Sequence, residues 1–188
     1  MLSIIENLKE AINGESNAKR KYELFAERAE QENLPEIAHL FKAISTAEAI
    51  HIKNHIRALT VITNAEVSLE DFVNVNEEIL KDGVKDTISN LIEAINGETY
   101  ETKQMYRKFV KNAKKEGNEV AELSFLLAKK AEKVHAKIFS RYLKKLEKNQ
   151  KIDKKKIYVC QICGNVEFKT PPLVCPICDH SQKFFKEF

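Results

Sequence analysis

The chain has 188 residues, 31% of them charged, with only five Gly and four Pro, a composition that favours long, soluble helices. Its length allows one domain with a small appendage. No run of about 18 uncharged apolar residues predicts a membrane span, and the formal net charge of +3 is too small to indicate a nucleic-acid partner. The first residues lack the basic-then-apolar order of a secretion signal.

Two amphipathic helices are predicted first, because apolar residues recur there at i, i+3, i+4 and i+7. One extends from Ile4 to about Ala29, and the next begins at Pro35, a residue suited to a first helical turn. Residues 63–86 then form a long connection, in which residues 68–71 are expected to start a short helix.

Two further helices are predicted after this connection. The third has Ile88 and Ile92 in its apolar stripe. The fourth follows a stop-and-cap pair at residues 117–118, and Val120 and Leu123 begin its stripe. Short turns within each pair of helices and one long crossover between the pairs are the ferritin-like connectivity. The predicted fold is therefore mainly α, a ferritin-like four-helix bundle with one long crossover.

The bundle sequence is also duplicated. Residues 10–15, Glu-Ala-Ile-Asn-Gly-Glu, recur letter for letter as residues 93–98, an offset of 83. After one inserted residue the offset becomes 84 and pairs Glu48-x-x-His51 with Glu132-x-x-His135. The bundle is therefore predicted to contain two copies of one helix pair.

The polar residues that the copies share fall inside the apolar stripes. Ionised carboxylates in a dry core cost several kcal/mol each unless compensated, and a pair of iron ions would compensate them. Each Glu-x-x-His sets an oxygen and a nitrogen ligand one turn apart on one face. One Glu from each remaining helix completes the ligand set of di-metal bundles, which suits iron or manganese. The predicted metal ligands and catalytic residues are Glu15, Glu48, His51, Glu98, Glu132 and His135.

One further carboxylate breaks the symmetry of this set. Glu101 lies one turn beyond Glu98, where the first copy has Ala18. We include Glu101 among the predicted ligands and catalytic residues. The hypothesis is that a surplus ligand on one side of the site exchanges when the metal changes oxidation state.

Three other polar residues lie near these ligands in the sequence. Tyr22 and Tyr106 follow the first Glu of each copy by two turns and are predicted to hydrogen-bond to the carboxylates. His55 lies one turn past a predicted ligand, but its repeat partner is Phe139. It is therefore interpreted as a hydrogen-bonded core histidine.

The four cysteines form two Cys-x-x-Cys knuckles near the C-terminus: Cys160, Cys163, Cys175 and Cys178. A disulfide framework would spread its cysteines through the chain, so the cluster indicates metal binding in a reducing compartment, and we predict a cytoplasmic location. Four thiolates bind one metal tetrahedrally, but the metal can be zinc as well as iron. The predicted domains are a bundle at 1–147, a lysine-rich linker at 148–156 and a metal-binding β/loop domain at 157–188.

Together these motifs resemble the rubrerythrins, from about Ile4 to the C-terminus. The resemblance is carried by Gly14-Glu15, Glu48-x-x-His51, Gly97-Glu98-x-x-Glu101, Glu132-x-x-His135 and the two knuckles, with Tyr158, Cys-x-x-Cys-Gly and Cys-Pro-x-Cys looking rubredoxin-like. It implies a non-haem iron peroxidase, active in oxidative-stress defence, that reduces hydrogen peroxide to water. The cofactors would be two Fe in the bundle and one Fe in the tail, with substitution by Zn or Mn left open.

The resemblance also implies roles for individual residues. Glu48 and Glu132 would bridge the irons, with Glu15 and Glu98 as terminal ligands. Glu101 and His51 would alternate on one iron while His135 remains on the other. Electrons would come from a rubredoxin or a reductase through the tail. Since the tail is expected to lie too far from the site of its own chain, the implied assembly is a homodimer, head-to-tail or helix-exchanged.

Three alternatives stay open at the level of sequence. A ferroxidase or iron-storage protein would use most of the same ligands, although the tail argues for a dedicated entry of electrons. An oxygen-reducing di-iron protein fits the same residues. A non-enzymatic protein with a structural zinc ribbon is the third.

Overall fold

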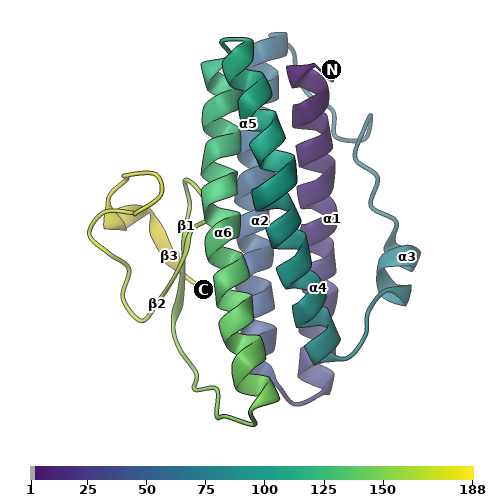
Figure 1. Cartoon of the computed structure of the whole chain (residues 1–188), viewed down its shortest axis with the longest axis vertical. Helices are drawn as coiled ribbons and strands as arrows, with labels where there is room; N and C mark the ends of the chain where they lie inside the picture. The colour runs from purple at the N-terminus through teal and green to yellow at the C-terminus, as the bar shows by residue number, and fades with distance from the viewer. Residues whose placement is uncertain (1–2) are drawn as a thin grey trace.

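The computed structural model describes residues 3–188 and shows a four-helix bundle with a small domain against its side (Figure 1). The first pair of helices is α1 (Ile4–Gln31) and α2 (Pro35–Thr63). The second pair is α4 (Thr87–Tyr100), continued by η1 (Glu101–Met105) and α5 (Tyr106–Lys115), and α6 (Glu119–Glu147). No helix among the described residues is long and apolar enough to cross a membrane.

Local signals explain where the helices begin. Ser3 caps α1 in a reciprocal arrangement, its hydroxyl accepting from the Glu6 amide while the Glu6 carboxylate accepts from the Ser3 amide. Asp86 caps α4 and Asn118 caps α6 through the same kind of side-chain acceptor. These caps satisfy amides that have no partner inside the helix.

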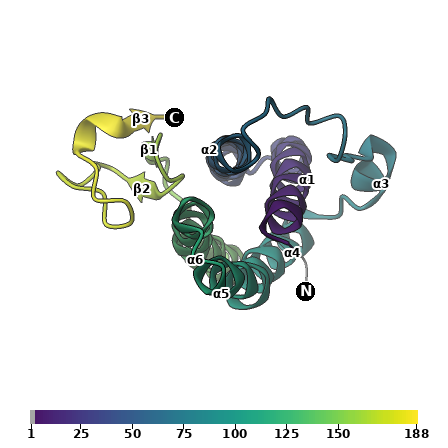
Figure 2. The ribbon, with the colours of Figure 1, turned by 90° about the horizontal axis from the view of Figure 1, so that it is seen from above.

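The crossover between α2 and α4 runs along the outside of α1, as the view down the bundle shows (Figure 2). Its short helix is α3 (Glu77–Asp82), not the segment expected at residues 68–71. Asn76 caps α3 by accepting from the Ile79 amide, whereas the carbonyl of Leu69 closes only a turn with the Phe72 and Val73 amides.

Two apolar clusters lie within the bundle, one on each side of a buried polar layer, and a third packs the small domain against α6. Of the two bundle clusters, one contains Phe25, Phe41 and Phe139, and the other contains Phe109 and Phe125. In each of these two the aromatic rings contact one another across helices. The clusters flank the glutamates and histidines, so the polar layer lies in a closely packed interior.

Four residues assigned to the apolar stripes are exposed instead. Ile88 and Ile92 of α4 are 40% and 43% exposed, and Val120 and Leu123 of α6 are 43% and 59% exposed. In α4 the buried face is centred on Leu91, and Ile92 follows by one residue, hence about 100° around the helix. The expectation for these four side chains was therefore wrong.

The small domain holds a three-stranded antiparallel sheet in the order β2-β1-β3. Its elements are β1 (Ile157–Cys160), β2 (Val166–Phe168), the short 3₁₀ helix η2 (Gln182–Phe184) and β3 (Phe185–Glu187). The domain lies beside α2 and α6 (Figures 1 and 2). This position corrects the expectation that the tail lies too far from the site of its own chain.

The small domain reaches this position because the linker turns back after α6 and runs along the bundle (Figure 1). From His135 to Glu147 the helix rises about 18 Å. The nine residues between Glu147 and Ile157 can span about 30 Å when extended. The linker is therefore long enough to return the tail to the level of the buried histidines.

Candidate metal centres

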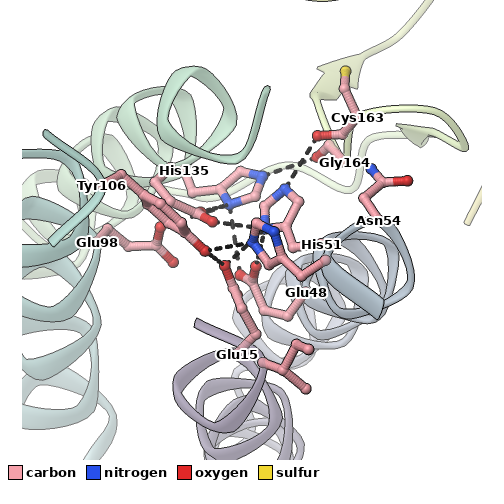
Figure 3. Close-up of polar contacts among 12 residues, drawn as sticks. Glu15, Glu48, His51, Asn54, Glu98, Tyr106, His135, Cys163 and Gly164 are labelled. Carbon is pink, nitrogen blue, oxygen red and sulfur yellow. Dashed lines mark hydrogen bonds and ion pairs between the residues drawn. The ribbon is translucent and has the colours of Figure 1, made fainter. Parts of the chain in front are cut away.

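The buried polar layer gathers six of the predicted ligands from four helical segments (Figure 3). α1 contributes Glu15, α2 contributes Glu48 and His51, α4 contributes Glu98, and α6 contributes Glu132 and His135. All six are at most 1% exposed. Since each Glu-x-x-His spans one turn, both of its side chains point to the same side of the helix.

These residues form two groups whose ligand atoms lie within 4.8 Å of one another. Glu48 and Glu132 belong to both groups. Glu15 and His51 belong only to the first, which we call the Glu15-side position, and Glu98 and His135 belong only to the second, the Glu98-side position. The arrangement has room for two metal ions that share two carboxylates.

The imidazole Nδ1 atoms point into these groups. Nδ1 of His51 lies 2.6 Å from Oε1 of Glu132 and 2.9 Å from Oε2 of Glu48. Nδ1 of His135 lies 2.8 Å from Oε2 of Glu132. The two rings are stacked with centroids 5.8 Å apart, so the two imidazoles lie side by side over the shared carboxylates of the two groups.

The electrostatics of the layer fit bound cations. Burial, together with the charge of Glu132, raises the pKa of Glu15 to about 8, and burial raises the pKa of Glu98 well above its ordinary value. Burial alone would lower the pKa of His51, but the carboxylates of Glu132 and Glu15 outweigh it and raise that pKa. Several carboxylate oxygens of the layer have no hydrogen-bond donor in the protein. Positive ions compensate such groups.

The two tyrosines contact the ligands crosswise between the repeats. The hydroxyl of Tyr22 on α1 donates to Oε1 of Glu98 at 2.7 Å. The hydroxyl of Tyr106 on α5 donates to Oε1 of Glu15. Each tyrosine therefore holds the carboxylate of the other copy, a relation that positions along one helix do not reveal.

Glu101 lies at the start of the π-helical segment η1, outside both ligand groups. Burial and the charges of Glu15 and Glu132 raise its pKa well above the ordinary value. A π-helix holds one residue more than an α-helix over the same rise, and such segments are common at functional sites. The shift of the repeat offset from 83 to 84 occurs between Glu98 and Tyr106 and was the sequence signal for this segment.

The second candidate metal centre is in the small domain, where the Cys160, Cys163, Cys175 and Cys178 ligand atoms also lie within 4.8 Å of one another. The Sγ atoms of Cys160 and Cys178 are 3.7 Å apart, as are those of Cys163 and Cys175. All four are free cysteines. Such a cluster of thiols suits one tetrahedral metal ion.

The first knuckle of the small domain touches both buried histidines (Figure 3). Nε2 of His51 lies 3.1 Å from the carbonyl oxygen of Cys163, and Nε2 of His135 lies 3.0 Å from that of Gly164. Nδ2 of Asn54 donates to the carbonyl of Ile162 at 2.8 Å. Each imidazole therefore joins a ligand group on one side to the tail on the other.

Gly164 and Asn54 were not among the predicted site residues. A Cβ atom on Gly164 would lie 2.5 Å from Nε2 of His51, and the residue has φ +75°, so only glycine permits this approach without strain. The Cys-x-x-Cys-Gly pattern signals a glycine turn but not the surface that the turn contacts. Asn54 carries no sequence signal, because an Asn on a helix surface is ordinary.

The fold and the two centres define a ferritin-like carboxylate–histidine bundle joined to a four-cysteine, rubredoxin-like domain. A family model described as Rubrerythrin matches residues 6–143, and one described as Rubrerythrin, rubredoxin-like domain, matches residues 158–186. The chain therefore belongs to the rubrerythrin family, and the predicted fold class is confirmed.

Individual relatives cover nearly the whole chain. Rubrerythrin-2 of Clostridium acetobutylicum is 37% identical over 96% of this chain and 94% of its own. Nigerythrin of Nitratidesulfovibrio vulgaris is 36% identical over 99% of this chain and 87% of its own. A solved structure of nigerythrin in a mixed-valence state superposes with a TM-score of 0.88 at 33% identity, covering 100% of this chain and 88% of that one.

Proposed function

We propose that the protein is a peroxidase that reduces hydrogen peroxide to water at a di-iron site, as a defence against oxidative stress. One observation carries the proposal: the histidines of the ligand groups hydrogen-bond directly to the first knuckle of the four-cysteine domain. Iron storage has no need for such a contact, whereas repeated reduction of an oxidant needs a route by which electrons return. Family membership supports an oxidoreductase.

The residues present fit two iron ions. Carboxylate and imidazole are ligands that iron accepts, and solved structures of nigerythrin are described as mixed-valent, partially reduced and all ferrous. Glu48 and Glu132, common to both ligand groups, would hold both ions. Glu15 and Glu98 would each hold one ion. The iron pair would supply the two electrons that the reduction of one peroxide requires.

The protein's own groups have three tasks in this reaction. The two imidazoles hold the first knuckle against the site through their Nε2 atoms. Tyr22 and Tyr106 each keep a proton on the hydroxyl oxygen, directed at Glu98 and Glu15. Glu101 begins the π-helical segment that leads into Tyr106, the tyrosine that donates to Glu15, and we propose that Glu101 would replace His51 as a ligand when the oxidation state changes.

The electron supply belongs to the same proposal. An iron ion held by the four cysteines would receive single electrons from a rubredoxin or a reductase and pass them to the bundle. The contact between the first knuckle and the two histidines within one chain supports a transfer inside the subunit. A homodimer, a cytoplasmic location and the domain boundaries given above remain predictions.

The experiment is anaerobic reduction of the full-length iron protein, followed by mixing with peroxide or with oxygen in a stopped-flow spectrometer. The expected result is that peroxide reoxidises the bundle much faster than oxygen does, and that the absorbance of the oxidised tail returns afterwards. Equal or faster reaction with oxygen, accompanied by continued uptake of added iron, would instead assign the protein to the ferroxidases.

A further inference from the structure

A buried chain of polar side chains continues outward from the Glu15-side position and uses all four helices. Behind Tyr106, which donates to Glu15, lies His55, whose Nε2 is 2.9 Å from the tyrosine oxygen. On the other side of that imidazole, Nδ1 is 2.7 Å from the hydroxyl of Ser124. Glu15, His55, Tyr106 and Ser124 come from α1, α2, α5 and α6.

When Glu15 is a metal ligand, the hydrogen bonds from Ser124 through His55 and Tyr106 to Glu15 can be donated in only one direction. A ligating carboxylate accepts, so the single hydroxyl proton of Tyr106 is given to Glu15. The tyrosine oxygen must then accept from Nε2–H of His55. Burial and the neighbouring His51 lower the pKa of His55 to about 3, so the ring is neutral and has one N–H. Its Nδ1 therefore accepts from the hydroxyl of Ser124.

The other half of the bundle has no equivalent of this series of hydrogen bonds, because two of the residues that would form it are apolar. The offset of 84 pairs His55 with Phe139 and Ser124 with Leu40. Tyr22, the counterpart of Tyr106, packs against Phe139 with ring centroids 5.4 Å apart, and among residues 3–188 its hydroxyl hydrogen-bonds only to Glu98. Two positions that are apolar in one copy are thus polar in the other, and both are buried.

A histidine in an apolar core costs free energy unless both of its nitrogens have partners. Here both do, and the partner of Nε2 is a tyrosine that already serves a candidate metal ligand. A hydroxyl that accepts a hydrogen bond also becomes a stronger donor, since bonds in a chain polarise one another. His55 and Ser124 are therefore placed to hold the Tyr106 hydroxyl in the orientation that donates to Glu15.

We infer that His55, supported by Ser124, is a positioning residue that orients Glu15 through Tyr106 and thereby makes the two metal positions unequal in affinity. The inference rests on the two-metal site of the proposed function but not on peroxide as the substrate. Groups that orient metal ligands in this way typically change metal affinity by about 10- to 100-fold.

The test is a titration of the full-length, metal-free protein with Co²⁺, followed by calorimetry and visible absorbance. Cobalt bound by the four thiolates has its own intense cobalt–sulfur absorption, which separates it from cobalt in the bundle. His55→Phe places in the first copy the type of residue that the second copy has. It is expected to weaken one of the two bundle positions about 10-fold and to leave the other unchanged.

Tyrosine variants identify which position has changed. Tyr106→Phe should weaken the same position as His55→Phe, and the double variant should be no weaker than Tyr106→Phe alone, because His55 acts through Tyr106. Tyr22→Phe is the matched control: its effect should fall on the other position and should add to that of His55→Phe. Additive losses for His55→Phe and Tyr106→Phe, or equal losses at both positions, would overturn the inference.

Two further measurements separate positioning from packing. His55→Gln, whose amide can donate to Tyr106, should recover most of the affinity that His55→Phe loses, and Ser124→Ala should give a smaller loss at the same position. In the zinc-loaded protein, which is diamagnetic, nitrogen NMR should find the proton of His55 on Nε2. A proton on Nδ1, or no recovery by glutamine, would contradict the inference.

The outcomes distinguish this inference from the proposed function. A protein that binds two cobalt ions in the bundle with these variant effects, yet does not react with peroxide, would retain the positioning role and lose the peroxidase. A bundle that binds a single cobalt ion would refute the two-metal site and, with it, the inference.

Discussion

Replacing Gly164 by alanine tests whether the contact between the two domains carries electrons. Gly164 has φ +75°, and an added Cβ would lie 2.5 Å from Nε2 of His51 and 3.1 Å from the carbonyl oxygen of Ala47. The left-handed conformation costs alanine about 1–2 kcal/mol. Because unbonded heavy atoms pack at about 3.5 Å, the knuckle must also move away by about 1 Å.

That movement would break the two hydrogen bonds from the histidines to the carbonyls of Cys163 and Gly164. At about 0.5–1.5 kcal/mol each, their loss shifts the balance from docked to undocked by about 5- to 150-fold. We expect both centres of Gly164→Ala to bind their metals. The tail of the reduced protein should nevertheless be reoxidised more slowly after mixing with peroxide in the stopped-flow experiment, because a smaller fraction of the tail is docked.

Two other glycines supply the controls. Gly117 has φ +66° with nothing within 4 Å of an added Cβ, so Gly117→Ala has the conformational cost without the clash. Gly97 lies in α4 next to a ligand with open space around it, and Gly97→Ala should be neutral or stabilise the helix by about 0.5–1 kcal/mol. Tail reoxidation at the wild-type rate in Gly164→Ala, or equal slowing in Gly117→Ala, would refute the reasoning.

Three further predictions concern the metals and pH. Glu132→Gln alters a residue common to both groups, so its bundle should lose both irons by elemental analysis. Glu101→Gln, outside both groups, should keep both irons in the oxidation state in which His51 is the ligand. Cys175→Ser should remove the tail metal and its colour while the bundle keeps two irons; loss of all three would contradict independent centres. In the metal-free protein, folding raises the pKa of Glu15 from 4.5 to about 8, so the folded state holds a proton that the unfolded state releases. Its free energy of unfolding should therefore fall as pH rises from about 4.5 to about 8, measured by urea denaturation, and an increase over that range would contradict the assignment.

The sequence was sufficient to locate the residues of the buried polar layer, because their pattern is redundant. Glu48-x-x-His51 alone is unremarkable on a charged helix, but its repetition 84 residues later, in register with two Gly-Glu pairs, left few other readings. The one-residue change in offset also located the π-helical segment, although its meaning was clear only from the structure. Local patterns of this kind report on one helix face at a time.

Features that depend on how distant segments pack were not predictable in the same way. Nothing in the lysine-rich linker specifies that it turns back along the bundle, so the contact of Gly164 with His51 and the bond from Asn54 were missed. The predicted apolar stripes were wrong at Ile92 and Leu123, which are exposed, because the periodicity of apolar residues does not define the width of the buried face. The crosswise bonds of the tyrosines likewise require the helix pairs to be assembled.

The differences between the two copies converge on one side of the site. Glu101 begins the π-helical segment, at a position where the first copy has Ala18. The π-helical segment that carries Glu101 leads directly into Tyr106, and His55 lies behind that tyrosine. A duplicated bundle that diverged at random would carry such changes around both positions. Because Tyr106 donates to Glu15, these differences support the proposal that the Glu15-side position is the one whose surroundings can adjust, while the Glu98-side position keeps a fixed set of ligands.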